Sequence, residues 1–163
     1  MATPIRAGLN PAPIVLGPDD GLRLQSGPGR DLVFKITGEE TGGAFDYSIV
    51  DVAPHGGPPL HMHHAHAEAL HVLEGRYKIR IGDQTFECEQ GGFAYMPAGM
   101  AHAFLNLTDR PGRVVLLYAP GGAHVFFEEY GPLARDGVHD RATLAAVFER
   151  HDMTLLGPPL TAD

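Results

Sequence analysis

The sequence predicts an all-β domain of the sandwich or barrel class. Glycine and proline, with 21 and 14 residues, make up about a fifth of the 163-residue chain and interrupt it at short intervals, as turn residues do. Between them lie short runs rich in β-branched and aromatic residues, over Leu32–Ile36, Phe45–Val52, Arg76–Ile81 and Val114–Tyr118. Many short strands at this spacing favour an antiparallel sandwich or barrel over alternating strands and helices.

The clearest strand pattern lies over Arg76–Ile81, where charged residues alternate strictly with apolar or aromatic ones. Because successive side chains of a strand point to opposite faces, Tyr77 and Ile79 are expected to face the core. Gly82–Gln84 then has the composition of a hairpin turn leading into a second strand at Thr85–Cys88. This segment is therefore predicted to be a half-buried hairpin.

One helix is predicted near the C-terminus, over Asp140–His151. Asp140 can cap its N-terminus, because a carboxylate accepts hydrogen bonds from the free N–H groups of a first turn. Leu144, Val147, Phe148 and His151 follow at helical spacing and share one face. The tail at Leu155–Leu160 contains Gly-Pro-Pro, so it cannot continue the helix and is expected to pack on the barrel.

These patterns divide the chain into three segments. Residues 1–30 are expected to form an irregular N-terminal arm with one strand near Ile14–Leu16. Residues 31–130 form the predicted β-barrel, and residues 131–163 the C-terminal helix and tail. A chain of 163 residues suits a single domain with one core.

Charge and composition exclude several classes of partner. Twelve Lys and Arg against 20 Asp and Glu give a formal charge of -8, so nucleic acid and anionic membrane surfaces are poor candidates. The single cysteine, Cys88, cannot form an intrachain disulfide. The N-terminal residues lack the apolar stretch of a signal peptide, and no run approaches the length of a membrane span. We therefore expect a cytoplasmic protein.

The distribution of histidine is the main clue to function. Five of the ten histidines lie between His61 and His71, a run that also contains Glu68, and His102 follows about thirty residues later. Imidazole nitrogens together with one carboxylate suit first-row divalent metals. The pattern predicts a mononuclear metal site.

Strand geometry selects the ligands within this run. His61 and His63 are two residues apart, so their side chains would converge on one side while His64 points away. After a short reversal, Glu68 can join them, with Leu70 and Val72 on its face filling the interior. His102, which follows the Pro97–Gly99 turn, is the expected fourth ligand. His64 and His66 are interpreted as exposed loop imidazoles, although His66 could replace Glu68 in another register of the loop; His71 should face outward.

Four aromatic residues fall on faces that this pattern directs inward: Tyr77, Phe93, Tyr95 and Phe104. They would either line a substrate pocket above the metal or simply fill the core.

Two segments carry a resemblance to a known family. Gly57–Glu68, continuing through Val72–Gly75, resembles the first signature motif of the cupin superfamily, and Gly91–Asn106 resembles the second. Thr37–Phe45 and Leu156–Leu160 are similar to bacterial single-domain cupins grouped with quercetin 2,3-dioxygenase. The resemblance covers roughly residues 28–160.

The resemblance implies a double-stranded β-helix, the jelly-roll barrel of cupins, with an N-terminal arm and a short C-terminal helix. It also implies one divalent transition metal per chain, drawn from Fe, Ni, Mn, Cu or Zn, at His61, His63, Glu68 and His102. Single-domain cupins commonly form homodimers, and pairing at the N-terminal arm would protect exposed strand edges.

For the reaction, the resemblance favours a dioxygenase-type oxidoreductase acting on a small aromatic or enolisable molecule, flavonol-like or polyketide-like. Glu68 would be a metal ligand and also a candidate catalytic base, since a carboxylate can accept a proton. A zinc-dependent, redox-neutral cyclase or isomerase and a non-catalytic small-ligand binder stay open, because fold does not fix function.

Overall fold

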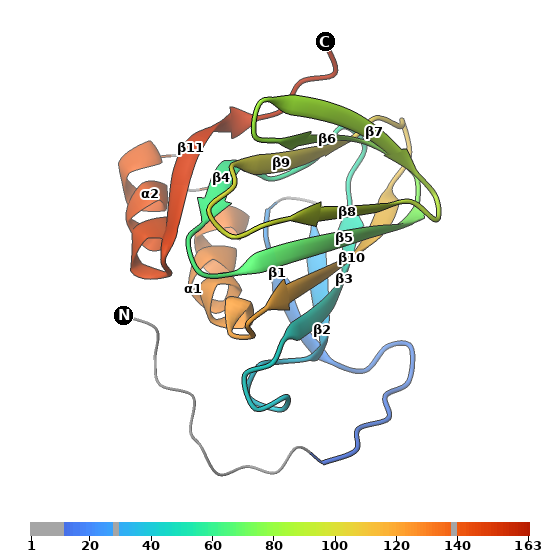
Figure 1. Cartoon of the computed structure of the whole chain (residues 1–163), viewed down its shortest axis with the longest axis vertical. Helices are drawn as coiled ribbons and strands as arrows, with labels where there is room; N and C mark the ends of the chain where they lie inside the picture. Colours follow the sequence, from blue (N-terminus) through green and yellow to red (C-terminus); the bar gives the residue numbers. More distant parts are fainter. Residues whose placement is uncertain (1–11, 28–29, 138–139) are drawn as a thin grey trace.

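The computed structural model describes residues 12–27, 30–137 and 140–163, and it consists of two antiparallel sheets that face each other (Figure 1). The six-stranded sheet has the order β1 (Leu22–Gln25), β2 (Asp31–Ile36), β3 (Asp46–Val52), β10 (Gly112–Ala119), β5 (Ala67–Glu74) and β8 (Phe93–Met96). The five-stranded sheet has the order β11 (Met153–Pro159), β4 (Pro59–His63), β9 (His102–Asn106), β6 (Arg76–Ile81) and β7 (Gln84–Glu89).

The chain passes repeatedly from one sheet to the other. β10 lies between β3 and β5, while β9 lies between β4 and β6, so neighbours in space are distant in sequence. All the strand pairs are antiparallel. This arrangement confirms the all-β prediction and matches a jelly-roll barrel.

The core lies between the two sheets and follows the predicted alternation. Tyr77 and Ile79 of β6 are buried, as are Leu70 and Val72 of β5. β6 and β7 form the expected hairpin, with Arg76 opposite Glu89 and Ile81 opposite Gln84. Burying one face of each sheet against the other stabilises the fold, because apolar side chains leave water.

Two helices pack together at one end of the barrel, α1 (Ala123–Arg135) and α2 (Arg141–Arg150) (Figure 1). The structure confirms the predicted C-terminal helix as α2, whose first turn is capped by Asp140 accepting from the backbone N–H of Thr143 at 2.9 Å. The helix α1 was not predicted. Gly131 and Pro132 near its end disfavour a helix, although Phe126, Tyr130 and Ala134 follow at helical spacing. Phe126, Tyr130, Val147 and Phe148 form a second apolar cluster between the helices.

The C-terminal tail is more regular than expected. It forms β11, which pairs with β4 and contains Pro158 and Pro159. Proline is tolerated there because β11 is an edge strand, where not every N–H has a ladder partner. None of the helices in the described part of the chain is long and apolar enough to cross a membrane.

The N-terminal arm differs from the prediction. Ile14–Leu16 forms no strand and is exposed, so the expected strand at that place is wrong. The arm instead contributes β1, which pairs antiparallel with β2 and becomes an edge of the six-stranded sheet. β1 lies within the segment predicted as the arm, and α1 extends across residue 130, where the barrel segment was predicted to end.

Candidate metal centre

Four predicted ligands converge between the two sheets. His61 and His63 come from β4, and His102 from the neighbouring β9, all in the five-stranded sheet; Glu68 comes from β5 in the opposite sheet. One ligand atom from each residue lies within 4.8 Å of all the others. The four residues are buried, with 2 to 8% of their surface exposed.

Strand register explains why these residues meet. His61 and His63 share a face of β4, and His61 is directly opposite His102 on β9. The loop after His63 then carries the chain into the six-stranded sheet and brings Glu68 in from the other side. Gly57 precedes β4 at a close crossing, where a Cβ atom would collide with the carbonyl oxygen of Phe104.

Backbone carbonyls orient two of the imidazole rings. The Nδ1–H of His61 donates to the carbonyl of Pro59 at 2.7 Å, and the Nδ1–H of His102 donates to that of Met100 at 2.9 Å. A carbonyl can only accept, so each ring carries its proton on Nδ1. In the neutral ring, the lone pair of Nε2 is then available to a metal.

His63 supplies the strongest sign that the cluster is incomplete without a ligand. Its Nε2 atom is buried and has no hydrogen-bond partner among the described residues, although it lies 3.5 Å from Glu68 Oε2. A buried polar atom without a partner is costly. A metal ion bound by three imidazoles and one carboxylate would satisfy it. The donor set therefore fits a divalent metal.

The electrostatics keep two of the rings neutral. Burial, together with the neighbouring His102, lowers the pKa of His61 to about 3. Burial and the adjacent imidazoles also lower the pKa of His63 well below its usual value. Burial opposes charge on His102 as well, but its hydrogen bond to Glu68 Oε2, at 3.2 Å, prevails and raises the pKa of this ring. Neutral imidazole is the form that binds a metal.

The cluster opens onto a cavity of about 760 Å³. His61, His63 and Glu68 line it, together with aromatic side chains from three elements: Phe104 of β9, Tyr118 of β10, and Phe126, Phe127 and Tyr130 of α1. Phe148 of α2 closes the wall beside the site, with its ring edge-to-face to that of His61 at 5.9 Å between centroids. A pocket of this size and character suits a small, largely apolar molecule.

Only one of the four predicted pocket aromatics, Phe104, lines this cavity. Tyr77 is fully buried but packs edge-to-face on Phe104 as part of the core. The expectation that Phe93 and Tyr95 face inward is wrong, since they are 66% and 56% exposed. β8 pairs with β5 so that Ala94 and Met96 stand opposite the inward residues Leu70 and Glu68, which turns Phe93 and Tyr95 to the outer face.

The other histidines of the run lie outside the ligand cluster. His64 is exposed and shares a 2.8 Å hydrogen bond between its Nε2 and Thr154 Oγ1, and His71 is exposed on the outer face of β5. His66 is half-buried and lines the cavity, 6.2 Å from His63 between ring centroids. The loop register therefore brings in Glu68, and not His66, as the fourth candidate ligand.

Sequence reasoning missed several cavity residues, notably Tyr118, Arg30 and those of α1. Tyr118 stacks on His63 with the ring centroids 5.9 Å apart. The alternation within Val114–Tyr118 was a usable signal, because Val114 and Leu116 share the inward parity of Tyr118. For α1 the spacing of Phe126, Tyr130 and Ala134 was a usable helical signal, whereas Arg30 gave no comparable one.

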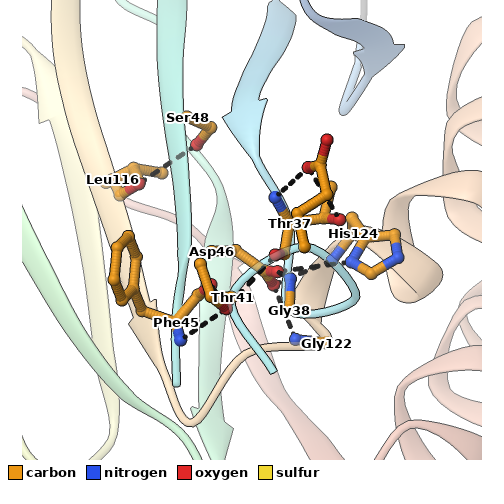
Figure 2. A network of polar contacts seen from close by, with 10 residues as sticks. Thr37, Gly38, Thr41, Phe45, Asp46, Ser48, Leu116, Gly122 and His124 are labelled. Atoms are coloured by element: carbon orange, nitrogen blue, oxygen red, sulfur yellow. Dashed lines mark hydrogen bonds and ion pairs between the residues drawn. The ribbon is translucent and has the colours of Figure 1, made fainter. Parts of the chain in front are cut away.

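A second buried polar group, Asp46, lies behind the cavity wall, where it contacts the lining residues Gly38, Gly122 and His124 (Figure 2). The carboxylate of Asp46 accepts hydrogen bonds from the backbone N–H groups of Gly38, Gly122 and His124 and pairs with Nδ1 of His124 at 3.3 Å. Figure 2 shows Asp46 between the Thr37–Thr41 turn and the start of α1. This carboxylate therefore ties the first turn of α1 to β3.

The comparisons with known proteins agree with this fold. The family model described as "Cupin domain" matches residues 48–118, a stretch that includes all four candidate ligands. Residues 48–118 therefore match a cupin domain, and the two facing antiparallel sheets agree with that match. A metal site is common among cupins, and the three-histidine, one-glutamate cluster of this chain could hold one.

Among curated proteins, the chain is similar to quercetin 2,3-dioxygenase of Bacillus subtilis, with 26% identity over 143 residues that cover 77% of this chain and 42% of that protein. The chain spans about half the length of the curated relatives it matches. 

Two solved structures share the fold. One, described as a sugar phosphate isomerase from a cupin superfamily, comes from Silicibacter pomeroyi; it has 22% identity and a TM-score of 0.57 over 65% of this chain and 75% of that one. KdgF from Halomonas sp. has 13% identity and a TM-score of 0.62 over 70% of this chain and 99% of that one.

Proposed function

We propose that this protein is a metal-dependent, dioxygenase-type oxidoreductase for a small aromatic or enolisable substrate, flavonol-like or polyketide-like. The observation that carries the proposal is the buried three-histidine, one-glutamate cluster at the wall of an aromatic-lined cavity. The similarity to quercetin 2,3-dioxygenase directs the choice of reaction class.

The four residues would hold one divalent ion through the Nε2 atoms of His61, His63 and His102 and a carboxylate oxygen of Glu68. A redox metal of the Fe, Mn, Ni or Cu type would supply a binding position for the substrate's hydroxyl oxygen and promote its reaction with dioxygen. The carbonyls of Pro59 and Met100 keep two of the rings in the tautomer that binding needs.

The remaining work falls to residues of the chain. The rings of Phe104, Phe126 and Phe148 line the cavity, where they would bind a flat substrate by apolar contact and exclude water. Glu68 is buried beside the imidazoles, and in this proposal its carboxylate would accept the proton that an enolic hydroxyl loses when it binds. Removing that proton makes the substrate more electron-rich and more reactive toward dioxygen.

The test is oxygen uptake by protein reconstituted separately with each candidate metal, in the presence of a panel of flavonols and enolisable phenols. We expect uptake that depends on both metal and substrate and that falls by a factor of about 100 or more in Glu68→Gln. His64→Ala is the matched control, because His64 is an exposed histidine of the same run and should leave uptake unchanged.

The absence of oxygen consumption with every metal and substrate would contradict the proposal. Product formation that is the same with and without oxygen, in the zinc-loaded protein, would replace it with a redox-neutral cyclase or isomerase.

A further inference from the structure

Arg30 is a buried arginine in the wall of the same cavity. It lies between β1 and β2, and only 8% of its surface is exposed. Its side chain lines the cavity together with Ser26, His61 and Tyr118. Neither the metal ligands nor the proposed oxygen chemistry uses this residue.

The guanidinium group is only partly satisfied. Nε donates to Ser26 Oγ at 2.7 Å, and Nη2 donates to the carbonyl of Ser26. Nη1 is buried and finds no hydrogen-bond partner within residues 12–27, 30–137 and 140–163. Two of the five N–H donors are thus engaged, both by neutral oxygens.

No carboxylate of the described residues pairs with the Arg30 charge. The nearby phenols of Tyr118 and Tyr130 do not neutralise it, because burial raises the pKa of both and keeps them uncharged. A buried charge without a counter-charge is unfavourable, and proteins rarely keep one unless it is paired or has a ligand.

The position of Arg30 relates it to the metal centre. Arg30 and His61 line one continuous cavity. A molecule in that cavity could therefore meet the guanidinium group and the metal ligands at the same time.

We propose that Arg30 binds a carboxylate of the ligand that occupies this cavity, so that the substrate of the proposed oxygenase is an aromatic or enolisable acid. A planar carboxylate matches the fork of donors that guanidinium presents, and the pair is strengthened by the surrounding aromatic wall. The inference rests on the proposed function only in calling this ligand a substrate.

The charge balance of the cavity favours a monoanion. The only other arginine or lysine among the described cavity-lining residues is Arg150, whose side chain is exposed and pairs with Glu129. Several lining residues are acidic, namely Glu39, Glu68, Glu149 and Asp152. Apart from a bound metal, Arg30 is the one unpaired cation of the described wall, and it can balance one carboxylate. A phosphate dianion would need more donors and would meet this acidic surround.

Calorimetric titration with cinnamate and cinnamamide tests the proposal. The two probes have nearly the same shape and an aromatic ring suited to the cavity, and they differ in charge. We expect the metal-loaded protein to bind cinnamate at least about tenfold more tightly than cinnamamide. The preference should persist after the metal is removed by chelation, because it depends on Arg30.

Substitutions test whether the preference for cinnamate over cinnamamide depends on Arg30. Arg30→Met should abolish it, whereas Arg30→Lys, which keeps the charge but loses the donor fork, should retain part of it. Arg23→Met is the matched control, since Arg23 is an exposed arginine on β1 and its loss should leave the preference intact. If Arg30→Met fails to fold, as circular dichroism would reveal, wild type and Arg30→Lys still decide the question.

Equal affinity for the two probes in the wild-type protein would overturn the proposal. So would a preference for cinnamate that survives in Arg30→Met or disappears when the metal is removed, because the carboxylate would then bind the metal. This outcome is separate from that of the oxygenase proposal. If binding prefers cinnamate through Arg30 but no oxygen is consumed, the role of Arg30 stands without the oxygenase. If oxygen is consumed only with neutral substrates, the oxygenase proposal stands and the role of Arg30 does not.

Discussion

His61 and His102 share one local interaction: in each, the Nδ1–H group donates a hydrogen bond to the backbone carbonyl two residues earlier in the chain. Each ring is therefore oriented by its own chain segment, with the acceptor on β4 for His61 and in the turn before β9 for His102. Among the residues that the structure describes, no carbonyl accepts from His63 in this way, and its Nε2 has no hydrogen-bond partner. The three rings consequently differ in how much they depend on a bound metal for their stability.

At the residue scale, replacing His102 or His61 with alanine should lower metal affinity by a factor of about 100 or more, because a first ligand matters at least as much as the groups that orient it. Elemental analysis after dialysis should find about one ion per wild-type chain and far less in either variant. His64→Ala should keep the wild-type content, since His64 is bonded to Thr154 and lies outside the cluster. Full metal content in His102→Ala would contradict the assignment of this ligand.

At the scale of elements, the fold depends on how the helices attach to the barrel. α1 is held at its first turn by Asp46 of β3, and α2 packs through Phe148 against Phe126 and Tyr130 of α1. Both attachments border the cavity, so the stability of the helical end and the shape of the site are linked.

Asp46→Asn should lower the free energy of unfolding by about 2–4 kcal/mol, because it removes the charged acceptor of several buried N–H groups and leaves His124 without its partner. Urea denaturation at neutral pH measures this change. Asp51→Asn is the control: Asp51 also lies on β3, but its side chain is half-exposed and pairs with Arg113 at the surface, so little change is expected. A loss of stability as small as that of the control would refute the anchoring role.

The Asp46–His124 pair should also make stability depend on pH. Hydrogen bonding to Asp46 raises the pKa of His124 above its ordinary value of 6.5, so the pair's contribution is complete below that pH and is lost as pH rises through the folded pKa. Burial would raise the pKa of Asp46, but its hydrogen bonds to His124, Gly122 and Gly38 outweigh burial and lower it. The carboxylate's contribution is therefore present above its ordinary pKa of 3.8 and is lost only as pH falls through the lowered value.

Urea denaturation across this range tests the sign. The difference in unfolding free energy between the wild type and His124→Asn should be larger near about pH 5.5 than near about pH 9. If the difference in unfolding free energy between the two proteins instead grows with pH, the His124 ring stabilises the fold in its neutral form.

Phe148→Ala should cost about 3–5 kcal/mol of stability, since the ring is 3% exposed and packs against α1 and the ring of His61. Thermal or urea unfolding measures it. Val125→Ala, at an exposed position of α1, should change stability by less than about 0.5 kcal/mol. Similar effects of the two substitutions would mean that the helical end is not packed as a core.

At the scale of the whole molecule, the two sheets end in edge strands, β1 and β8 in one and β11 and β7 in the other. Exposed strand edges invite pairing with another chain unless something covers them. β8 and β7 also carry exposed aromatic side chains, Phe93, Tyr95 and Phe86.

We propose that the protein is a homodimer. Sedimentation equilibrium should give about twice the 17.5 kDa mass of the chain. A mass equal to that of the single chain over a range of concentrations would refute the proposal.

The alternation of side chains made much of the fold and the site predictable. The period of two in Arg76–Ile81 identified a strand, and the same rule put His61 and His63 on one face and Glu68 with Leu70 and Val72. The rule gave the wrong face for β8. A register shift of one residue turns every side chain of a strand to the opposite face, and the register of β8 is fixed by its pairing with β5. The helix α1 was missed because Gly131 and Pro132 near its end disfavour a helix, although Phe126, Tyr130 and Ala134 recur at helical spacing; packing and Asp46 hold it in place.

The sequence by itself determined the all-β class, the ligand types and their spacing, because these depend on local geometry and on the chemistry of imidazole and carboxylate. Only the tertiary structure decided that Glu68 and not His66 faces the three histidines, that α1 and α2 wall the cavity, and that Arg30 is buried there without a counter-charge. These are relations between segments far apart in the chain, and they arise when two sheets and two helices exclude water from the space between them, which no local pattern encodes.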